Sequence, residues 1–435
     1  MPPGELLALE DKGENRRLTH YLFRYPAKFH PPVIATLLHR YTKDNDWILD
    51  PFVGSGTLLV EAAALGRRAV GVDIDPVAIN VARAKTRRYD LAKLEGVCKE
   101  LLDRMAVLER TSDSYKTLMR TDISHREFEK IVAQEELEIP AIPNLHHWFR
   151  TYVLIDLARI KKAIDGCDTD ERTELLLHII FSSIIRNASN ADPVPVSGLE
   201  YTAHMRKRDA AGRLVNPFAL FRTSTRKAFL AVEEWMAVLP ENAFEPYALN
   251  GSALKLPDGV PRYVDTVITS PPYHNAVDYY RRHQLEMFWL GLTRTQAERL
   301  ALLPNYIGRP KIAQKNVFFT EPWKPSNLAD QWERKIRGKS TQRAFDFRHY
   351  VQSMRCVFGE LAGRLRSGSR AIFVLGQSQW NGESIPTEEL FAELAVPNFE
   401  LRDVLYYPVK NRYMSYTRRN AASIDREYVI VLHRS

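Results

Sequence analysis

The stretch Trp47-Ile48-Leu49-Asp50-Pro51-Phe52-Val53-Gly54-Ser55-Gly56-Thr57 decides the fold. Its apolar start predicts a buried strand that ends at Asp50, and its two glycines let the backbone pass close to a ligand before a helix begins. The amino terminus of such a helix presents free N–H groups. A second apolar run, Ala69 to Asp73, again ends in an acid, which is the usual partner of ribose hydroxyls. We therefore predict a nucleoside-binding βαβ unit; the alternative is an ordinary βαβ turn whose glycines serve packing alone.

The spacing of the glycines favours a cofactor without a pyrophosphate. Gly54 and Gly56 form Gly-x-Gly, whereas dinucleotide sites carry Gly-x-Gly-x-x-Gly. A carboxylate at Asp50 would repel phosphate and attract an α-ammonium group. S-adenosylmethionine fits this pattern, because it combines an adenosine, a sulfonium and an amino-acid tail and has no phosphate. A nicotinamide-dependent oxidoreductase fits it poorly.

A second stretch, Thr269-Ser270-Pro271-Pro272-Tyr273, follows the apolar run Val264 to Ile268. The run predicts a short buried strand, and the two prolines end its ladder and stiffen the turn. Ligands of open α/β sheets bind at the carboxyl ends of strands. A hydroxyl, prolyl carbonyls and an aromatic ring at that place suit a planar group with an exocyclic amine. A Pro-Pro loop that merely follows a core strand is the alternative.

Composition and charge are those of a basic globular protein. The chain has 435 residues, 45% of them hydrophobic, and a net charge of +8, which favours a polyanionic partner. Its three scattered cysteines argue against a disulfide framework, and the pair His146-His147 lacks ligands at metal spacing, so we predict no metal site. The sequence shows no secretion signal and no apolar run of eighteen residues. We therefore expect a cytoplasmic protein.

The order of these patterns predicts how the chain is divided. Residues 1–17 are polar and expected to be flexible. Residues 18–90 and 244–435 would form one α/β domain, with further strands at Tyr247 to Asn250, Arg370 to Gly376, Val404 to Tyr407 and Glu427 to His433. The last two strands would be an antiparallel pair at the sheet edge. Residues 91–243 have little strand signal and predict a mostly helical insertion.

Two basic regions are candidates for contact with a polyanion. One lies in the insertion, where Tyr201, Phe218 and Phe221 are interleaved with Arg206, Lys207, Arg208, Arg213, Arg222, Arg226 and Lys227. The other, residues 294–348, is long, basic and poor in regular pattern, which predicts a functional loop. A merely solvated basic face is the alternative in the insertion.

The two motifs together, in this order, resemble the amino-group DNA methyltransferases of the class I S-adenosylmethionine fold. Their Ser-Pro-Pro-Tyr form is typical of cytosine-N4 enzymes, many of which belong to restriction–modification systems. The resemblance extends to Tyr25 to Phe29, to residues 278–286 and to residues 426–431, and it covers the insertion only loosely. It implies an α/β fold: a class I (Rossmann-like) methyltransferase sheet with a mostly helical insertion and an antiparallel C-terminal edge hairpin.

The resemblance also implies a role for each motif. Asp50, Gly54 and Gly56 would line the methionine end of the cofactor, Asp73 would hold the ribose, and residues 25–28 would close over the cofactor. Asn250 would contact the adenine, although an acid is often found there. The implied cofactor-binding residues are Tyr25, Pro26, Ala27, Lys28, Asp50, Pro51, Phe52, Gly54, Ser55, Gly56, Thr57, Asp73 and Asn250, and the implied catalytic residues are Ser270, Pro271, Pro272 and Tyr273.

The activity expected from the resemblance is methyl transfer from S-adenosyl-L-methionine to the N4 amine of a cytosine flipped out of duplex DNA. Ser270 and the Pro271 carbonyl would orient the amine, and Tyr273 would stack on the base, which is worth about 1–3 kcal/mol. The insertion and the basic loop would then be candidate DNA-contacting regions.

Three other functions stay open. An adenine-N6 DNA methyltransferase has a similar motif. A guanine-N2 RNA methyltransferase usually carries an N-terminal RNA-binding domain, for which residues 1–24 leave no room. A non-catalytic nucleic-acid-binding protein would be expected to lose Gly54, Gly56 or Ser270. The sequence leaves open the recognition site, the oligomeric state and the existence of a cognate restriction endonuclease.

Overall fold

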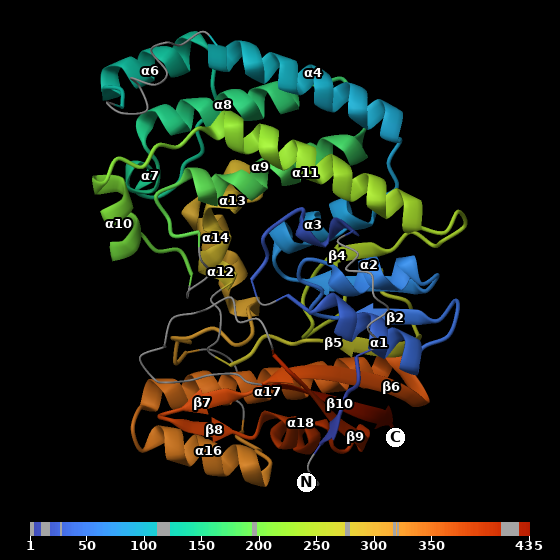
Figure 1. Cartoon of the computed structure of the whole chain (residues 1–435). Coiled ribbons are helices and arrows are strands. Elements are labelled where there is room, and N and C mark those ends of the chain that lie inside the picture. The colour runs from blue at the N-terminus through green and yellow to red at the C-terminus, as the bar shows by residue number, and fades with distance from the viewer. Residues whose placement is uncertain are drawn as a thin grey trace.

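An eight-stranded sheet runs through the molecule (Figure 1). The computed structural model describes residues 4–9, 18–26, 28–110, 122–193, 198–274, 279–315, 319, 322–409 and 426–435; Ala27 and Asp278 lie outside these ranges. The strand order is β1-β9-β10-β6-β5-β2-β3-β4. The strands are β1 (Glu5–Leu6), β2 (Trp47–Asp50), β3 (Arg68–Asp73), β4 (Tyr247–Asn250), β5 (Val264–Thr269), β6 (Leu365–Gly376), β9 (Phe399–Pro408) and β10 (Arg426–Arg434).

Strand β10 is antiparallel to both of its neighbours, and the other pairs of this sheet are parallel. A parallel sheet with one reversed strand near its edge confirms the predicted α/β, Rossmann-like fold of the class I methyltransferases. A separate two-stranded sheet is formed by β7 (Ser378–Trp380) and β8 (Glu383–Ile385).

The N-terminal segment corrects one expectation. Glu5 and Leu6 form β1, which pairs with Leu405 and Tyr406 of β9, and Leu7 is buried. Glu5 and Leu6 are therefore part of the sheet and not of a flexible end, and β9 is covered by this short strand. Residues 1–3 and 10–17 lie outside the described residues.

Alternate residues of the central strands face two different layers of helices, as the period of a strand requires. Ile48, Ile268 and Ile372 pack with α1 (Pro31–Tyr41) and α2 (Thr57–Ala64). Their neighbours Leu49 and Val267 pack in the cluster of α16 (Asn327–Arg337), α17 (Thr341–Arg364) and α18 (Thr387–Ala395). Because helices cover both faces of the sheet, the side chains on both faces of these strands must be apolar. The strands therefore appear in the sequence as near-continuous apolar runs.

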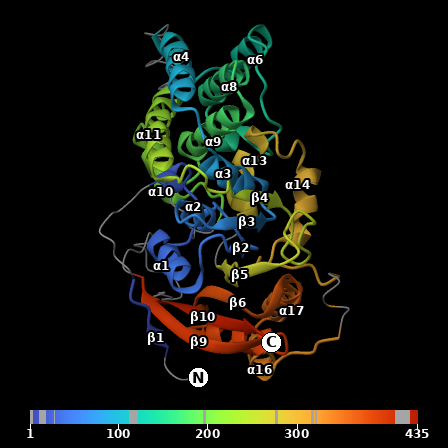
Figure 2. The same cartoon turned by 90° about the vertical axis from the view of Figure 1, so that its right-hand side faces the viewer.

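Residues 91–243 are mostly helical and have a core of their own, above the sheet in Figure 1 and Figure 2. Trp289 of α13 (Gln284–Trp289) inserts into this core against Phe149 and Phe181. Among the described residues of this range, the helices are α4 (Leu91–Arg110), α6 (His125–Gln134), α7 (Leu145–Trp148), α8 (Thr151–Asp165), α9 (Glu171–Ala188), α10 (Ala203–Ala210) and α11 (Pro217–Val238). The insertion is thus packed onto the chain that follows the Ser270–Tyr273 turn.

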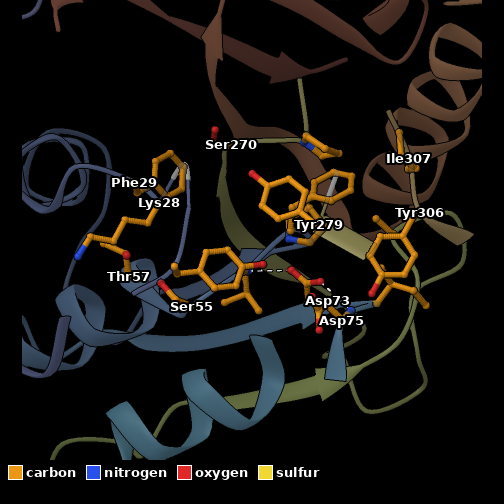
Figure 3. A pocket seen from close by; sticks show the side chains of 18 of the residues that line it. Lys28, Phe29, Ser55, Thr57, Asp73, Asp75, Ser270, Tyr279, Tyr306 and Ile307 are labelled. Carbon is orange, nitrogen blue, oxygen red and sulfur yellow. Dashed lines mark hydrogen bonds between the residues drawn. The ribbon is translucent and has the colours of Figure 1, made fainter. Parts of the chain in front are cut away.

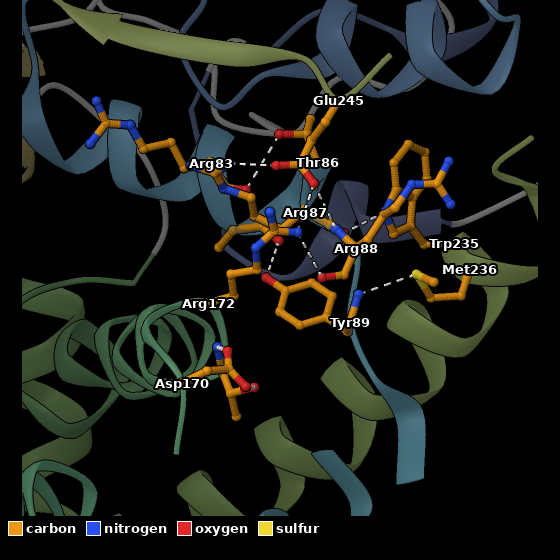
Figure 4. A network of polar contacts seen from close by, with 12 residues as sticks. Arg83, Thr86, Arg87, Arg88, Tyr89, Asp170, Arg172, Trp235, Met236 and Glu245 are labelled. Atoms are coloured by element: carbon orange, nitrogen blue, oxygen red, sulfur yellow. Dashed lines mark hydrogen bonds and ion pairs between the residues drawn. The ribbon is translucent and has the colours of Figure 1, made fainter. Parts of the chain in front are cut away.

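A polar network ties the two ends of the helical insertion together (Figure 4). Glu245, where the chain returns toward β4, forms ion pairs with Arg87, just after α3 (Pro76–Thr86), and with Arg172 of α9. The indole nitrogen of Trp235 on α11 donates to the Arg87 carbonyl at 3.0 Å. Glu245 therefore links the departing chain, the returning chain and the inserted helices.

Helices α14 (Gln296–Leu302) and α16, the 3-10 turn η2 (Leu303–Asn305) and the start of α17 lie within residues 294–348. The prediction of an irregular loop there was wrong for these parts. Several of its basic side chains are also ion-paired: Arg334 with Asp330, Arg337 with Glu333 and Lys335 with Glu383. The sequence showed the charge but not these pairs, two of which, Asp330–Arg334 and Glu333–Arg337, are helical i,i+4 pairs.

Over the residues that the structure describes, no helix has the length and apolarity to cross a membrane. The same residues contain no cluster of three or more His, Cys, Asp or Glu that could hold a metal ion.

Candidate active site

A cavity lies at the carboxyl ends of β2, β3 and β5 (Figure 3). It brings the two sequence motifs together although more than two hundred residues separate them. The predicted residues that line it are Tyr25, Lys28, Pro51, Phe52, Gly54, Ser55, Thr57, Asp73, Ser270 and Pro272. Lining residues that the sequence analysis missed are Phe29, Val53, Ile74, Asp75, Ala253, Tyr279, Asn305, Tyr306 and Ile307.

The glycine-rich turn is fastened to the end of β3. Gly56 begins α2 with a left-handed φ of 77°, and a Cβ there would lie only 2.9 Å from the Cβ of Ala82 on α3, so glycine is required. The amide of Gly54 donates to Oδ2 of Asp73 at 2.8 Å. Burial, with Asp75 close by, raises the pKa of Asp73 to about 7. The carboxylate expected to hold a ribose therefore also shapes the turn.

Asp50 connects the two motifs. Its Oδ1 accepts hydrogen bonds from the Thr269 hydroxyl at 2.6 Å and from the Phe52 amide at 3.0 Å. The side chain is fully buried, which raises its pKa to about 7. Asp50 is not among the cavity-lining residues, and its Oδ2 takes no hydrogen bond from the described residues. Thr269 thus joins β5 to β2, a role that its place in the sequence did not reveal.

Two hydroxyls of the cavity also have no partner among the described residues. Ser55 Oγ and Thr57 Oγ1 are buried, and neither forms a hydrogen bond within the part of the chain that the structure describes. Buried polar atoms normally have partners. Together with the free amides at the start of α2, these hydroxyls fit the carboxylate of an amino-acid tail. The Asp73 carboxylate fits hydroxyls of a ribose. The residues present are therefore compatible with S-adenosylmethionine.

Three further predicted positions behave differently from expectation. Asn250 does not line the cavity; its Nδ2 donates to the carbonyls of Asp73 and Ile74 at 3.1 and 3.2 Å, so it ties β4 to the end of β3. Pro26 and Gly56 also do not line the cavity, and Ala27 lies outside the described residues.

The Ser270–Tyr273 turn forms the opposite side of the cavity. Ser270 and Pro272 line it, whereas Pro271 and Tyr273 do not. The ring of Tyr273 lies against Gly376 of β6, where any Cβ would overlap it. Its hydroxyl donates to Oε1 of Glu427 at 3.0 Å, and Tyr407 donates to the other oxygen of the same carboxylate. Burial, followed by the nearby Glu427 charge, raises the pKa of Tyr273 well above its usual value.

An aromatic group closes a third side. The rings of Tyr25 and Tyr279 are nearly parallel, with centroids 6.0 Å apart, and His283 lies 5.1 Å from the Tyr25 ring. Nδ1 of His283 is 2.6 Å from Oδ2 of Asp75, and both side chains are buried. Asp75 also caps α3 by accepting from the Val77 amide. The pair therefore joins the cofactor side to the segment that follows the Ser270 turn.

The basic cluster predicted in the insertion is divided by the fold. Arg206, Lys207 and Arg208 are exposed on α10. Arg213 instead pairs with Asp209, and Arg222 pairs with Glu109 at 2.7 Å. Phe218 and Phe221 are buried in the helical core, so their expected place on a basic surface was wrong. Helical periodicity in α11 was the signal that could have separated them.

Residues 7–84 match the family model described as DNA methylase. The chain is 23% identical over 363 residues to the type II methyltransferase M.MjaII of Methanocaldococcus jannaschii, covering 69% of this chain and 67% of that protein. It is 23% identical over 409 residues to M.MvaI of Kocuria varians, covering 87% and 81%.

A shorter match joins it to a tRNA (guanine(10)-N2)-dimethyltransferase of Methanothermobacter thermautotrophicus, with 33% identity over 82 residues, 19% of this chain and 24% of that protein. The family match, the long similarities and the strand order together support a DNA amino-methyltransferase of class I fold, which implies S-adenosylmethionine as its cofactor.

Proposed function

We propose that this protein methylates the N4 amine of cytosine in duplex DNA. The observation that carries the proposal is the meeting of Ser270 with the glycine-rich turn around one cavity. Thr269, the residue before Ser270, is hydrogen-bonded to Asp50, the residue that begins that turn. This hydrogen bond would fix the position of the Ser270 hydroxyl, which orients the amine, relative to the glycine-rich turn, which binds the methyl donor.

The chain's contribution to the reaction is positioning. S-adenosylmethionine supplies an electrophilic methyl group on its sulfonium. An exocyclic amine is a weak nucleophile because its lone pair is delocalised into the ring. Ser270 Oγ and the Pro271 carbonyl would accept hydrogen bonds from the amine and turn its lone pair toward the methyl group. Fixing reactants in this way supplies several kcal/mol of rate acceleration. Ser270 is too weak a base to remove the proton beforehand, so the proton leaves after transfer.

The target base must leave the helix to reach the cavity. Tyr279 lines the cavity and is stacked near Tyr25, so it is a candidate surface for the flipped base. Tyr273, the residue first expected to stack on the base, does not line the cavity. Tyr273 is fixed through Glu427 at the edge of the site. The exposed α10 residues Arg206, Lys207 and Arg208 are candidates for contacts with DNA phosphates. On this proposal residues 18–90 and 244–435 form the cofactor domain and residues 91–243 the recognition region.

The Ser-Pro-Pro-Tyr form favours cytosine over adenine. The short match to a tRNA enzyme covers 82 residues, so it does not separate DNA from RNA as a substrate. The long similarities to type II methyltransferases favour DNA and a role beside a restriction endonuclease.

The product of the reaction tests this proposal. The protein is incubated with S-adenosylmethionine labelled in its methyl group and either duplex DNA or total tRNA, and the nucleic acid is digested to nucleosides. We expect label in N4-methylcytosine from DNA. Label only in N6-methyladenine, or only in the tRNA sample, would overturn the cytosine assignment.

A further inference from the structure

One wall of the cavity comes from a segment to which neither motif belongs. Asn305, the last residue of η2, and the next two residues, Tyr306 and Ile307, line the cavity. Tyr306 and Ile307 lie across it from the glycine-rich turn (Figure 3). Tyr306 is 6% exposed, yet its hydroxyl forms no hydrogen bond with the residues that the structure describes. A buried phenol in a ligand cavity without a partner indicates that a bound molecule completes its hydrogen bonding.

The position of this phenol is fixed from two sides. Its ring meets the ring of Tyr280 edge to face, with centroids 5.6 Å apart. Arg299 in turn lies 4.0 Å from the centre of the Tyr280 ring. The Tyr306 amide donates to the Leu303 carbonyl at 3.3 Å, which closes the η2 turn. The hydroxyl is therefore held in place before any ligand arrives.

The Tyr306 hydroxyl faces two carboxylates. Figure 3 shows it directed toward Asp75 and Asp73. Burial raises the pKa of Tyr306 well above its usual value, and the charges of Asp75 and Asp73 raise it further. The phenol therefore stays protonated and can donate as well as accept. Asp73 accepts from the Gly54 and Asp75 amides, while Asp75 is engaged with Val77 and His283.

A ligand group between this phenol and the Asp73 carboxylate must both donate and accept hydrogen bonds, which a hydroxyl does. Apolar lining residues stand beside it, namely Ile74, Ala253 and Ile307, and they suit a flat purine ring. Asn250, the residue first expected at the adenine, is used elsewhere.

We infer that Tyr306 binds a ribose hydroxyl of the cofactor, and that Asn305 to Ile307 close the nucleoside half of the cavity. This inference rests on the assignment of S-adenosylmethionine as the cofactor.

The same segment touches the Ser270–Tyr273 turn. Gly308 has a left-handed φ of 80°, and a Cβ there would lie 3.3 Å from the Tyr273 carbonyl and 3.6 Å from Pro272. One short segment therefore contains both Tyr306, which would bind the ribose, and Gly308, which packs on the proposed catalytic turn. A nucleoside bound at Tyr306 would therefore also stabilise the Ser270–Tyr273 turn.

Calorimetry with the Tyr306→Phe variant tests the inference without turnover. The probes are S-adenosylhomocysteine, 5′-methylthioadenosine and a 2′,3′-dideoxy analogue of 5′-methylthioadenosine. Losing one hydrogen bond should weaken the first two ligands by about 3- to 10-fold. The dideoxy analogue should bind the variant and the wild-type protein equally, because it has no hydroxyl for Tyr306 to reach.

Tyr280→Phe is the matched control, because Tyr280 packs on Tyr306 but does not line the cavity. It should bind all three ligands like the wild-type protein, and thermal melting checks that both variants fold. Equal binding of S-adenosylhomocysteine by wild type and Tyr306→Phe would overturn the inference and leave the proposed function intact. An equal loss for the dideoxy analogue would overturn the ribose assignment. Absence of S-adenosylhomocysteine binding by the wild type would overturn both.

Discussion

The two sides of the cavity differ in how their polar groups are used. The glycine wall, Val53 to Thr57 with Asp73, contains two buried hydroxyls that have no partner among the described residues. The proline wall, Thr269 to Tyr273, has its flanking hydroxyls bonded to carboxylates, Thr269 to Asp50 and Tyr273 to Glu427. Unused hydrogen-bonding capacity suits ligand binding, and fixed geometry suits a reaction that depends on alignment. The difference suggests that one wall holds the cofactor and the other positions the substrate.

A serine-to-alanine substitution on each wall should give the largest difference in kcat between the two walls. Ser270→Ala removes the hydroxyl that orients the amine and should lower kcat by about 100-fold, the scale of a misplaced reactant. Ser55→Ala, the matched change on the glycine wall, should leave kcat near the wild-type value at saturating cofactor. Steady-state methylation of DNA measures both. Equal losses of kcat would contradict the division.

The pH dependence of cofactor binding probes Asp73. Its pKa of about 7 lies above the ordinary value of 3.8, so the folded protein without ligand keeps a proton that the unfolded chain releases. Stability without ligand should therefore fall as pH rises from about 4 to about 7.

The ionised carboxylate accepts from ribose and attracts the positively charged cofactor, so affinity for S-adenosylmethionine should rise from pH 6 toward pH 8. The rise should be at most about tenfold per unit below pH 7. Calorimetry at several pH values measures it, with Asp73→Asn as the control that should show a shallower profile, because Asp50, whose pKa is also about 7, is unchanged in it. A wild-type affinity that falls over this range would contradict the role given to Asp73.

A smaller effect is expected behind the proline wall. Glu427→Ala frees the Tyr273 hydroxyl, and a lost hydrogen bond worth about 1 kcal/mol should lower kcat by about fivefold. Tyr407→Phe removes the other hydroxyl from the same carboxylate and leaves Tyr273 bonded, so its kcat should stay close to wild type. Single-turnover rates compare the two. A larger loss in Tyr407→Phe than in Glu427→Ala would show that Tyr273 is not positioned through Glu427.

Local pattern predicted the parts of the fold that are set by local physics. The strands ending at Asp50, Asp73 and Thr269 are short apolar runs closed by a glycine turn or by prolines, and the structure contains all three. The helical character of residues 91–243 was evident from the same kind of pattern.

What the sequence could not reveal depends on contacts across the fold. Tyr306 lies in a segment whose charges suggested a loop, and its place in the cavity follows from how η2 packs. Nothing near Asn250 in the sequence indicates that its side-chain amide donates to the carbonyls of Asp73 and Ile74. Thr269 and Glu427 acquire partners 219 and 154 residues away, respectively. Such pairings are fixed by the order of strands in the sheet and not by neighbouring residues.

Binding of S-adenosylhomocysteine to the two serine variants tests the division of the walls most directly. Ser270→Ala should bind it with the wild-type dissociation constant, while Ser55→Ala should bind it about 2- to 10-fold more weakly, the scale of one hydrogen bond. Isothermal calorimetry on the three proteins without DNA gives these constants. A Ser270→Ala variant that loses as much affinity as Ser55→Ala, or more, would contradict the assignment of cofactor binding to the glycine wall.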